Sequence, residues 1–385
     1  MKTVLVAYGT RPEAVKVGPL ILELRSSAHI NVVPVTTGQH REMLDQVNGV
    51  FGIEPVLDIA VLRQGQSLNA LAARVLQGMD SALAQVEPDA ILVQGDTTTV
   101  AMSALAAFHR HVPVVHLEAG LRSHDLQSPF PEEANRRLAG QLTRLHLAPT
   151  GQARANLLAE GFPGQDVVVT GNTVIDALLH TAQTEATFSD PEVADAVRSG
   201  RRIILMTAHR RENLGEPMRD IARAVAEIAQ RYPDVQVVFP AHKNPRVREL
   251  IFPVLTPLPN VSLIEPLDYV QFIHLQQAAH LILTDSGGVQ EEAPSLGKPV
   301  LVLRTNTERP EAVEAGTVRL VGTDVNKILS EVSRLLDDAS AYEEMAHAVN
   351  PYGDGLASRR SVAAIEEMFG LGHREADFVP MVDQS

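Results

Sequence analysis

Short apolar runs alternate with longer segments of helical periodicity along the chain, in two separate series. In the first series, the apolar run Thr3–Ala7 precedes a helical pattern over about Pro12–Ser26. A parallel strand is buried on both faces and is joined to the next by a helix, so this alternation predicts a parallel sheet covered by helices. The series continues with Asn31–Thr36, His40–Asn48, a helix over Asn69–Leu83, strand Ala90–Val93, helix Thr98–His109 and strand Pro113–His116.

A second series with the same rhythm begins at Ile203–Thr207. Between the two series, the stretch from Gly171 to Gly200 contains a helical pattern and then a Pro-containing polar segment, which favours a passage between domains. The second series continues with helix Met218–Arg231, strand Val235–Phe239, strand Val261–Ile264, helix Val270–Ala279, strand Leu281–Thr284 and strand Pro299–Leu303. The sequence therefore predicts an α/β protein with two doubly wound, Rossmann-like parallel-sheet domains that bind ligands in a central cleft between them.

One helix start in the first series is specified by its residue types. Pro131 is followed by two acids, and proline and acids are favoured in the first turn of a helix. Leu138, Leu142 and Leu145 follow at helical spacing and predict its apolar face.

The composition narrows the range of functions. The 385 residues include 33 Lys+Arg and 47 Asp+Glu, which gives a formal net charge of −14, so we expect no broad attraction to nucleic acid or to an anionic membrane. The chain has no Cys, which excludes disulfides, thiolate metal sites and a cysteine nucleophile and suits a reducing cytoplasm. The first apolar stretch reaches Gly9 too soon for a signal peptide or a membrane span. We therefore expect a cytoplasmic protein with local anion sites.

Charged side chains follow the predicted strands of the first series. Arg11 and Lys16 lie where a helix opens after the first strand, a position that suits an anionic group. Asp96, Glu118 and Glu132 lie at the ends of consecutive strands or at a helix start. Each acid alone is also consistent with helix capping. Three acids on one rim favour a site in which burial separates their pKa values, so that one serves as acid and another as base.

The strand ends of the second series carry a different set of residues. His209 follows the strand Ile203–Thr207 without a second His at ligand spacing, so a phosphate-facing or proton-donating role is favoured over a metal. Ser286, Gly287 and Gly288 follow Leu281–Thr284 and permit close approach of the backbone to a diphosphate at a helix start. The alternative is an ordinary strand-to-helix turn with an acidic first turn.

Long motifs occur in one order along nearly the whole chain. They are Gly9-Thr10-Arg11-Pro12-Glu13-Ala14, Gln39-His40-Arg41-Glu42-Met43-Leu44-Asp45-Gln46, Gly95-Asp96-Thr97, Glu118-Ala119-Gly120-Leu121-Arg122, Pro131-Glu132-Glu133-Ala134-Asn135-Arg136, Gly171-Asn172-Thr173-Val174-Ile175-Asp176-Ala177, His209-Arg210-Arg211-Glu212, Thr284-Asp285-Ser286-Gly287-Gly288-Val289-Gln290-Glu291-Glu292, Thr307-Glu308-Arg309-Pro310-Glu311 and Asn350-Pro351-Tyr352-Gly353-Asp354-Gly355. In these motifs the chain resembles the non-hydrolysing UDP-N-acetylglucosamine 2-epimerases of bacteria, which have the two-domain fold of the glycosyltransferase B type.

The resemblance implies reversible conversion of UDP-N-acetylglucosamine to UDP-N-acetylmannosamine, without metal or nicotinamide cofactor, in the supply of N-acetylmannosamine units for cell-surface polysaccharide. It implies site residues as follows: the catalytic group Asp96, Glu118, Glu132 and His209; Arg11, Lys16 and Arg136 near the sugar diphosphate; Ser286, Gly287, Gly288, Glu292 and Arg309 on UDP; and Phe272 near the uracil.

The resemblance also implies regulation and assembly. Family members bind a second UDP-N-acetylglucosamine as an allosteric activator, and Gln39, His40 and Glu42 lie in the matching segment, whereas Gly65 stands where some relatives carry an arginine. A homodimer is expected. The expected domains are 1–170 for the sugar and the catalytic acids, 171–358 for UDP, and 359–385 for a helix that returns to the N-terminal domain and ends in a frayed tail.

The chemistry is consistent with these residue types. No carbonyl lies next to carbon 2 of the sugar, so direct loss of its proton is implausible, whereas elimination of UDP across carbons 1 and 2 gives 2-acetamidoglucal, and readdition completes the inversion. Alternatives are a hydrolysing 2-epimerase, a 2-epimerase of a modified UDP-sugar, a glycosyltransferase and a non-catalytic UDP-sugar sensor.

Overall fold

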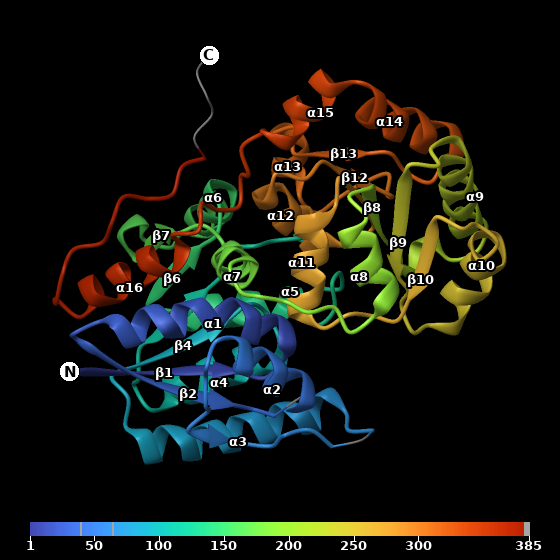
Figure 1. The fold of residues 1–385 in the computed structure, drawn as a ribbon. Coiled ribbons are helices and arrows are strands. Elements are labelled where there is room, and N and C mark those ends of the chain that lie inside the picture. The colour runs from blue at the N-terminus through green and yellow to red at the C-terminus, as the bar shows by residue number, and fades with distance from the viewer. Residues whose placement is uncertain (39–40, 64, 381–385) are drawn as a thin grey trace. The chain divides into compact units, whose positions relative to one another are not determined.

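The computed structural model describes residues 1–38, 41–63 and 65–380, with the backbone alone for 41–43. The chain divides into two compact units (Figure 1). The first comprises Met1–His180 and Tyr352–Val379, and the body of the second is Thr181–Pro351. The chain therefore leaves the first unit within helix α7 (Thr173–Ala182) and re-enters it at Tyr352, whereas the sequence analysis placed these two boundaries after residues 170 and 358.

The sheet of the first unit has seven strands, all parallel, in the order β3-β2-β1-β4-β5-β6-β7. The direction of strand addition reverses between β1 and β4, where Val4 is paired with Ala90. Ligands of such sheets bind at the carboxyl ends of the strands beside this reversal. The strands are β1 (Lys2–Tyr8), β2 (Ile30–Thr36), β3 (Leu57–Asp58), β4 (Ala90–Gln94), β5 (Val114–Leu117), β6 (Leu145–Ala148) and β7 (Val167–Val169).

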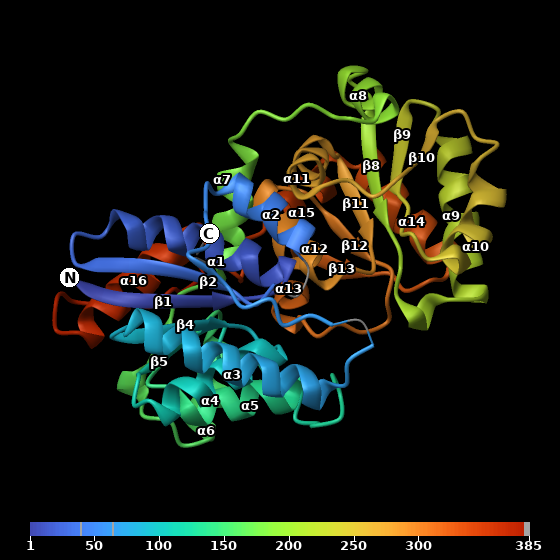
Figure 2. The same ribbon diagram turned by 90° about the horizontal axis from the view of Figure 1, so that it is seen from below.

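Helices cover both faces of this sheet. Helices α3, α4 and α5 pack together along one face, and α1, α2 and α16 lie on the other (Figure 2). The helices are α1 (Arg11–Ser26), α2 (Arg41–Val50), α3 (Leu68–Val86), α4 (Thr98–His109), α5 (Glu132–Leu142), α6 (Gly151–Ala159), α7 and α16 (Ala357–Met368), with a short 3₁₀ turn at Gly164–Asp166.

The second unit repeats this architecture with six parallel strands in the order β10-β9-β8-β11-β12-β13. Here the reversal lies between β8 and β11. The strands are β8 (Arg202–Thr207), β9 (Val235–Pro240), β10 (Val261–Ile264), β11 (Leu281–Thr284), β12 (Val300–Val302) and β13 (Val318–Leu320). The prediction of two doubly wound parallel sheets is therefore confirmed.

The helices of the second unit form two groups. Helices α9, α10 and α14 share one apolar cluster with the sheet, on one of its faces. Helices α8 and α11 contact the other face of the sheet (Figure 1). The helices are α8 (Pro191–Arg198), α9 (Glu216–Arg231), α10 (Pro245–Leu255), α11 (Tyr269–Ala278), α12 (Gly287–Glu292), α13 (Pro310–Glu314), α14 (Val325–Asp337) and α15 (Ala339–Ala346), with 3₁₀ turns at Arg211–Asn213 and Ala293–Leu296.

One predicted helix ends earlier than its apolar spacing suggests. Helix α5 ends at Leu142, and Leu145 begins strand β6, where it is paired with Val115. Leu138 is exposed, so the predicted apolar face is wrong. The physical reason is that Thr143 takes an extended conformation and Arg144 N–H donates to Val114 O, which draws the chain into the sheet.

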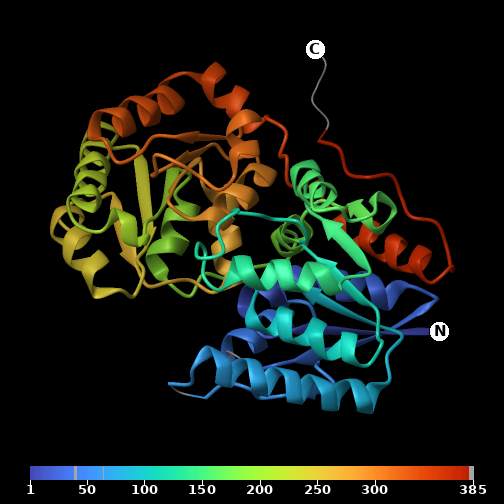
Figure 3. The ribbon, with the colours of Figure 1, turned by 180° about the vertical axis from the view of Figure 1, so that it is seen from behind.

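The last helix belongs to the first unit. Helix α16 packs on α1, and Ser27 Oγ donates to Glu366 Oε1 at 2.6 Å. Beyond it, Phe378 N–H donates to Val169 O at 2.7 Å, and Asp377 Oδ1 accepts from Val169 N–H at 3.1 Å. Figure 3 shows the red ribbon that leads from α16 toward the C-terminus. The expectation of a frayed tail is therefore wrong for residues 371–379, because the backbone groups of edge strand β7 find partners there. Residues 381–385 lie outside the described part of the chain.

Candidate active site

Glu118 is a largely buried carboxylate with three hydrogen-bond donors. It follows β5, and its φ of +64° is rare for a residue with a side chain. Oε1 accepts from Lys16 Nζ at 2.5 Å and from Asn172 Nδ2 at 3.2 Å, and Oε2 accepts from Gln94 Nε2 at 2.5 Å. Charge-assisted bonds of this kind hold the orientation of a carboxylate firmly. The structure thus brings together Lys16 and Glu118, and adds Gln94 and Asn172, which the sequence analysis did not single out.

Asp96 follows β4 and forms an ion pair with Arg136. Arg136 Nη1 also donates to Glu133 Oε2 at 3.0 Å, and Arg137 Nε donates to Glu133 Oε1 at 2.9 Å. Burial alone would raise the pKa of Glu133, but the N–H of Ser123 and the two guanidinium groups outweigh it and hold that pKa below its usual range.

Glu132, the predicted catalytic acid beside Glu133, is the first residue of α5 and is only half-buried. Within residues 1–38, 41–63 and 65–380, no group forms a hydrogen bond or ion pair with its carboxylate. The structure therefore gives the two adjacent acids different environments. Glu133 forms ion pairs with Arg136 and Arg137, and Glu132 forms none with the residues that the structure describes.

Glu13 connects the starts of two helices. Its Oε2 accepts from Gly9 N–H at 2.6 Å and from Thr10 N–H at 2.8 Å, and its Oε1 accepts from Thr97 Oγ at 2.6 Å. Burial raises the pKa of Glu13 above its usual range, and these neutral donors offset only part of that effect. Glu13 therefore occupies the N–H groups of Gly9 and Thr10 just before α1. Arg11, at the start of α1, makes no ion pair with any other residue that the structure describes.

A histidine on β5 contacts the Asp96 turn, and a second histidine lies beside it on β6. His116 Nε2 donates to Gly95 O at 2.7 Å, and Gly95 has a φ of +81°. His116 is paired in the sheet with His146. Burial lowers the pKa of His116 and lowers the pKa of His146 to about 3. Both rings are therefore neutral at pH 7, and the first supports the turn that carries Asp96.

In the second unit, Asp285 forms the centre of the hydrogen-bond network at the β8/β11 reversal. Its Oδ1 lies 3.2 Å from His209 Nδ1, and its Oδ2 accepts from Arg210 N–H at 2.8 Å and from Asn213 Nδ2 at 3.1 Å. Burial would raise the pKa of Asp285, but the bonds from His209 and from the backbone hold it below its usual range. Asp285 thus fixes the ring of His209, and the ring of His242 stacks against it with centroids 5.5 Å apart.

The Ser286–Gly288 segment opens α12 at the carboxyl end of β11. Arg309 Nε donates to Glu291 Oε1 at 2.6 Å, and a Cβ atom on Gly287 would lie only 2.4 Å from Arg309 Nη1, so a larger residue at 287 would displace the guanidinium group of Arg309. Glu292 Oε2 accepts from Gln276 Nε2 at 3.3 Å. Phe272 is half-buried on α11.

The expected allosteric segment is only partly described. Gln39 and His40 lie outside the described residues, and Glu42 lies in α2, where only the backbone is described. A cavity of about 130 Å³ lies next to this segment and is lined by Thr36, Gly38, Leu44, Asp45, Asn48, Pro55 and Asp58. Gly65 has a φ of +71°.

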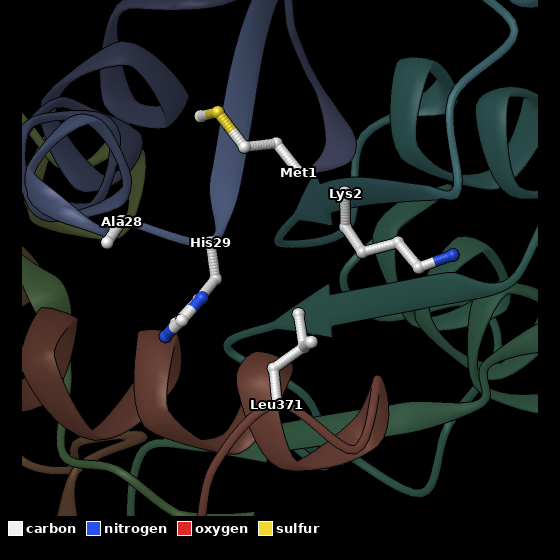
Figure 4. Close-up of a pocket in the computed structure, with 5 residues that line it drawn as sticks. All are labelled: Met1, Lys2, Ala28, His29 and Leu371. Carbon is white, nitrogen blue, oxygen red and sulfur yellow. The ribbon is translucent and has the colours of Figure 1, made fainter.

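The larger of the two described cavities is remote from these residues. It has a volume of about 360 Å³ and is lined by Met1, Lys2, Ala28, His29 and Leu371 (Figure 4). It lies at the amino end of β1, whereas the Gly9–Glu13 loop follows the carboxyl end of that strand. In the part of the chain that the structure describes, no group of three or more His, Cys, Asp or Glu side chains is placed to hold a metal ion. None of the described helices is long and apolar enough to cross a membrane.

Comparison with known proteins decides the family. The family model of UDP-N-acetylglucosamine 2-epimerase matches residues 22–366. The chain belongs to the UDP-N-acetylglucosamine 2-epimerase family. It is 50% identical to the UDP-N-acetylglucosamine 2-epimerase of Yersinia pestis, over 94% of this chain and 98% of that one.

Solved structures support the same assignment for this family member. The Neisseria meningitidis UDP-N-acetylglucosamine 2-epimerase, solved with UDP-N-acetylglucosamine, is 46% identical with a TM-score of 0.84, over 95% of this chain and all of that one. Staphylococcus aureus MnaA, solved with UDP, is 44% identical with a TM-score of 0.87, over 98% of this chain and all of that one. The resemblance to UDP-N-acetylglucosamine 2-epimerases that the motifs indicated is therefore confirmed.

Four residues of this epimerase-family site were not predicted from the sequence, although the sequence carried one signal for them. Asn172, Glu133 and Asp285 each lie inside a motif that supports the resemblance, and Gln94 directly precedes another. Motif membership does not assign a role, however. Only the hydrogen bonds distinguish a residue that supports an acid from one that is merely adjacent to it.

Two buried carboxylates are expected to respond in opposite ways to the same amide substitution. In Glu13→Gln, the amide oxygen can accept both backbone N–H groups while the amide nitrogen donates to Thr97, so the free energy of unfolding should be unchanged or higher. Both carboxylate oxygens of Asp285 accept hydrogen bonds, so in Asp285→Asn the new NH₂ group must face an N–H donor. We therefore expect the free energy of unfolding to fall by about 2 kcal/mol or more. Urea unfolding monitored by circular dichroism measures both effects.

The pH dependence provides the control. The pKa of Glu13 is raised on folding, so its stabilisation is present at low pH and is lost as the pH rises; the advantage of Glu13→Gln should grow with pH. The pKa of Asp285 is lowered, so the deficit of Asp285→Asn should shrink on acidification. Equal losses in the two variants would contradict the assigned hydrogen bonds.

Proposed function

We propose that this chain epimerises carbon 2 of UDP-N-acetylglucosamine by eliminating UDP and adding it back, with UDP-N-acetylmannosamine as the product and no net hydrolysis. The observation that carries the proposal is the Glu118 network, in which an ammonium and two amides hold one carboxylate at the carboxyl end of β5. Relatives at about half identity are UDP-N-acetylglucosamine 2-epimerases, and the Neisseria meningitidis enzyme binds UDP-N-acetylglucosamine.

The reaction needs a base and an acid at carbon 2. In the elimination, a carboxylate takes the carbon 2 proton, the bond from carbon 1 to the UDP oxygen breaks, and a double bond forms between carbons 1 and 2. In the return step, a proton is delivered to the other face of carbon 2, and a β-phosphate oxygen of UDP forms the new bond to carbon 1. Asp96, Glu118 and Glu132 are the proposed proton carriers, because acids in different environments suit the two opposite transfers.

Cations and N–H groups must stabilise the departing diphosphate. Arg11, Lys16 and Arg136 are the proposed partners of the sugar diphosphate in the first unit. In the second unit, UDP binds through Ser286, Gly287, Gly288, Glu292 and Arg309, with Phe272 near the uracil. His209, whose Nδ1 is held by Asp285, presents its other ring nitrogen to the leaving group.

We extend the proposal to regulation, assembly and location. UDP-N-acetylglucosamine bound at Gln39, His40 and Glu42 activates the enzyme, which is a cytoplasmic homodimer that supplies N-acetylmannosamine units for surface polysaccharide. These assignments rest on the family resemblance. The domain roles are the sugar and the acids in the first unit and UDP in the second.

Gly288 gives a test of the proposed UDP site. A Cβ atom at Gly288 would lie 3.5 Å from Glu292 Oε1, an ordinary contact, so the first carbon of a side chain fits there without moving the protein backbone. We expect UDP affinity to fall at least about tenfold, or about 1.4 kcal/mol, in titration calorimetry. Gly151→Val, at the open start of α6, is the matched control and should bind UDP normally. An unchanged affinity in folded Gly288→Val would refute the assignment.

Isotopes test whether UDP leaves during turnover. In D₂O, deuterium should enter carbon 2 of the product. An ¹⁸O label in the oxygen that bridges carbon 1 and the β-phosphate should scramble into non-bridging positions. Oxidation at carbon 3 would give the first signature without the second, and a hydrolysing enzyme would release free N-acetylmannosamine. Mass spectrometry and ³¹P NMR measure all three outcomes.

The amide variants Asp96→Asn, Glu118→Gln and Glu132→Gln complete that test. Each keeps the size of the side chain and removes its basicity, so kcat should fall about a hundredfold or more. UDP affinity should survive, because the Ser286 segment belongs to the second unit. Full activity in all three would eliminate the proposed roles of these acids.

Activation is tested in the reverse direction. With UDP-N-acetylmannosamine alone, progress curves should show a lag, because the activator must first be produced, and added UDP-N-acetylglucosamine should abolish the lag. Linear curves that do not respond to the addition would reject activation and leave the epimerase assignment intact.

A further inference from the structure

The chain re-enters the first unit beside the residue that contacts Glu118. Asn172 N–H donates to Tyr352 O at 2.7 Å. A Cβ atom on Gly353 would lie 3.1 Å from Ile175 Cγ1 and 3.4 Å from Asn172 O, so a larger residue at 353 would push against this loop. The returning backbone and the Asn172 loop are therefore packed directly against each other, although 180 residues separate Asn172 from Tyr352 in the sequence.

A buried carboxylate joins the same loop to the last helix. Helix α16 has no side-chain cap of its own. Asp176, on α7, replaces that cap: its Oδ1 accepts from Ser358 N–H at 2.7 Å and its Oδ2 from Ala357 N–H at 3.2 Å. A carboxylate at the start of a helix is favoured by the orphan N–H groups and by the helix dipole. Asp176 thus ties α7, which begins one residue after Asn172, to α16.

An arginine on α16 makes the third connection. Arg360 forms a bidentate pair with Asp354, at 2.7 and 2.6 Å, and its Nη1 also donates to Thr170 O at 3.3 Å. Thr170 lies two residues before Asn172. Segment 352–360 therefore contacts the Asn172 loop on both sides, through Thr170 before it and Asp176 after it.

Asn172 itself has both ends of its side-chain amide engaged. Oδ1 accepts from Val174 N–H at 3.1 Å, at the start of α7, and Nδ2 donates to Glu118 Oε1 at 3.2 Å. The residue is 4% exposed. Its amide therefore has two separable functions: the oxygen stabilises the local turn, and the nitrogen reaches the carboxylate of Glu118.

We propose that Asn172 is a positioning residue for Glu118 and that the returning segment 352–360 acts in the reaction by fixing Asn172. The inference rests on the proposed role of Glu118 in proton transfer at carbon 2. Lys16 and Asn172 share one oxygen of Glu118, and Gln94 binds the other. The last helix thus contributes to the orientation of Glu118 through Asn172.

Asn172→Asp separates positioning from a purely structural role. The aspartate keeps an oxygen for Val174 N–H, so the local turn is preserved, but it places an acceptor where Nδ2 donated to Glu118. We expect kcat to fall about tenfold or more while the UDP dissociation constant and the KM for UDP-N-acetylglucosamine stay within about twofold. A role confined to the turn predicts wild-type kcat instead.

Asp176→Asn tests the contribution of the returning segment. It weakens the cap of α16, and we expect kcat to fall about threefold with UDP affinity unchanged. The matched control is Asp190→Asn, which weakens the cap of α8 in the second unit, where Asp190 Oδ1 accepts from Glu192 N–H at 2.9 Å, and which should leave kcat unchanged. Circular dichroism of all three variants confirms that they are folded before kinetics are compared.

The outcomes separate this inference from the proposed function. Wild-type enzyme that places no solvent deuterium at carbon 2 would refute the proposed function itself. Wild-type enzyme that exchanges normally, together with a folded Asn172→Asp variant of wild-type kcat, would overturn only the positioning role. Loss of kcat in Asn172→Asp with normal kcat in Asp176→Asn would limit that role to Asn172 and reject the returning segment.

Discussion

A carboxylate that leaves water must receive hydrogen-bond donors from the protein, and this requirement governs the architecture of both strand-end sites. Glu13, Glu118, Glu133 and Asp285 lie at or next to the carboxyl ends of parallel strands or the starts of helices. Glu13, Glu133 and Asp285 accept from backbone N–H groups there, and Glu118 accepts from side chains. Their donors come from different elements of the same unit. Each buried acid therefore connects loops and helices that the hydrogen bonds of the sheet do not join.

The type of hydrogen-bond donor decides whether the pKa of a buried carboxylate is raised or lowered. Glu13 and Asp176 are served by backbone N–H groups and hydroxyls, and burial raises their pKa values above the usual range. Glu133 receives two guanidinium groups and Asp285 an imidazole, and their pKa values are lowered in spite of burial. The two sets show how one fold raises the pKa of some buried carboxylates and lowers the pKa of others.

The two units use the same device for different purposes. In each, chemistry-bearing residues follow strands at or beside the reversal of strand order: β1, β4 and β5 in the first unit, β8 and β11 in the second. The first unit gathers acids and cations around Glu118 and Asp96, which suits proton transfer. The second gathers glycines, a histidine and an arginine around Asp285 and Ser286, which suits a diphosphate. The division follows from side chains, since the backbones are alike.

The sequence by itself indicated two parallel sheets, because a buried parallel strand and its crossover helix leave a local pattern, although that pattern placed Leu145 of β6 on a helix. It also determined the family, because long motifs recur in order, and it located Asp96, Glu118 and Ser286 at strand ends. The tertiary structure decided which groups form hydrogen bonds with these residues. Glu118 accepts hydrogen bonds from Lys16, which is 102 residues away in the sequence, from Gln94, which is 24 away, and from Asn172, which is 54 away. Asn172 in turn donates to the carbonyl of Tyr352, near the other end of the chain. It also decided that Glu133 rather than Glu132 takes the two arginines, and that the tail past α16 covers β7. Hydrogen bonds between distant residues impose no periodicity on the chain, so only the folded backbone could specify them.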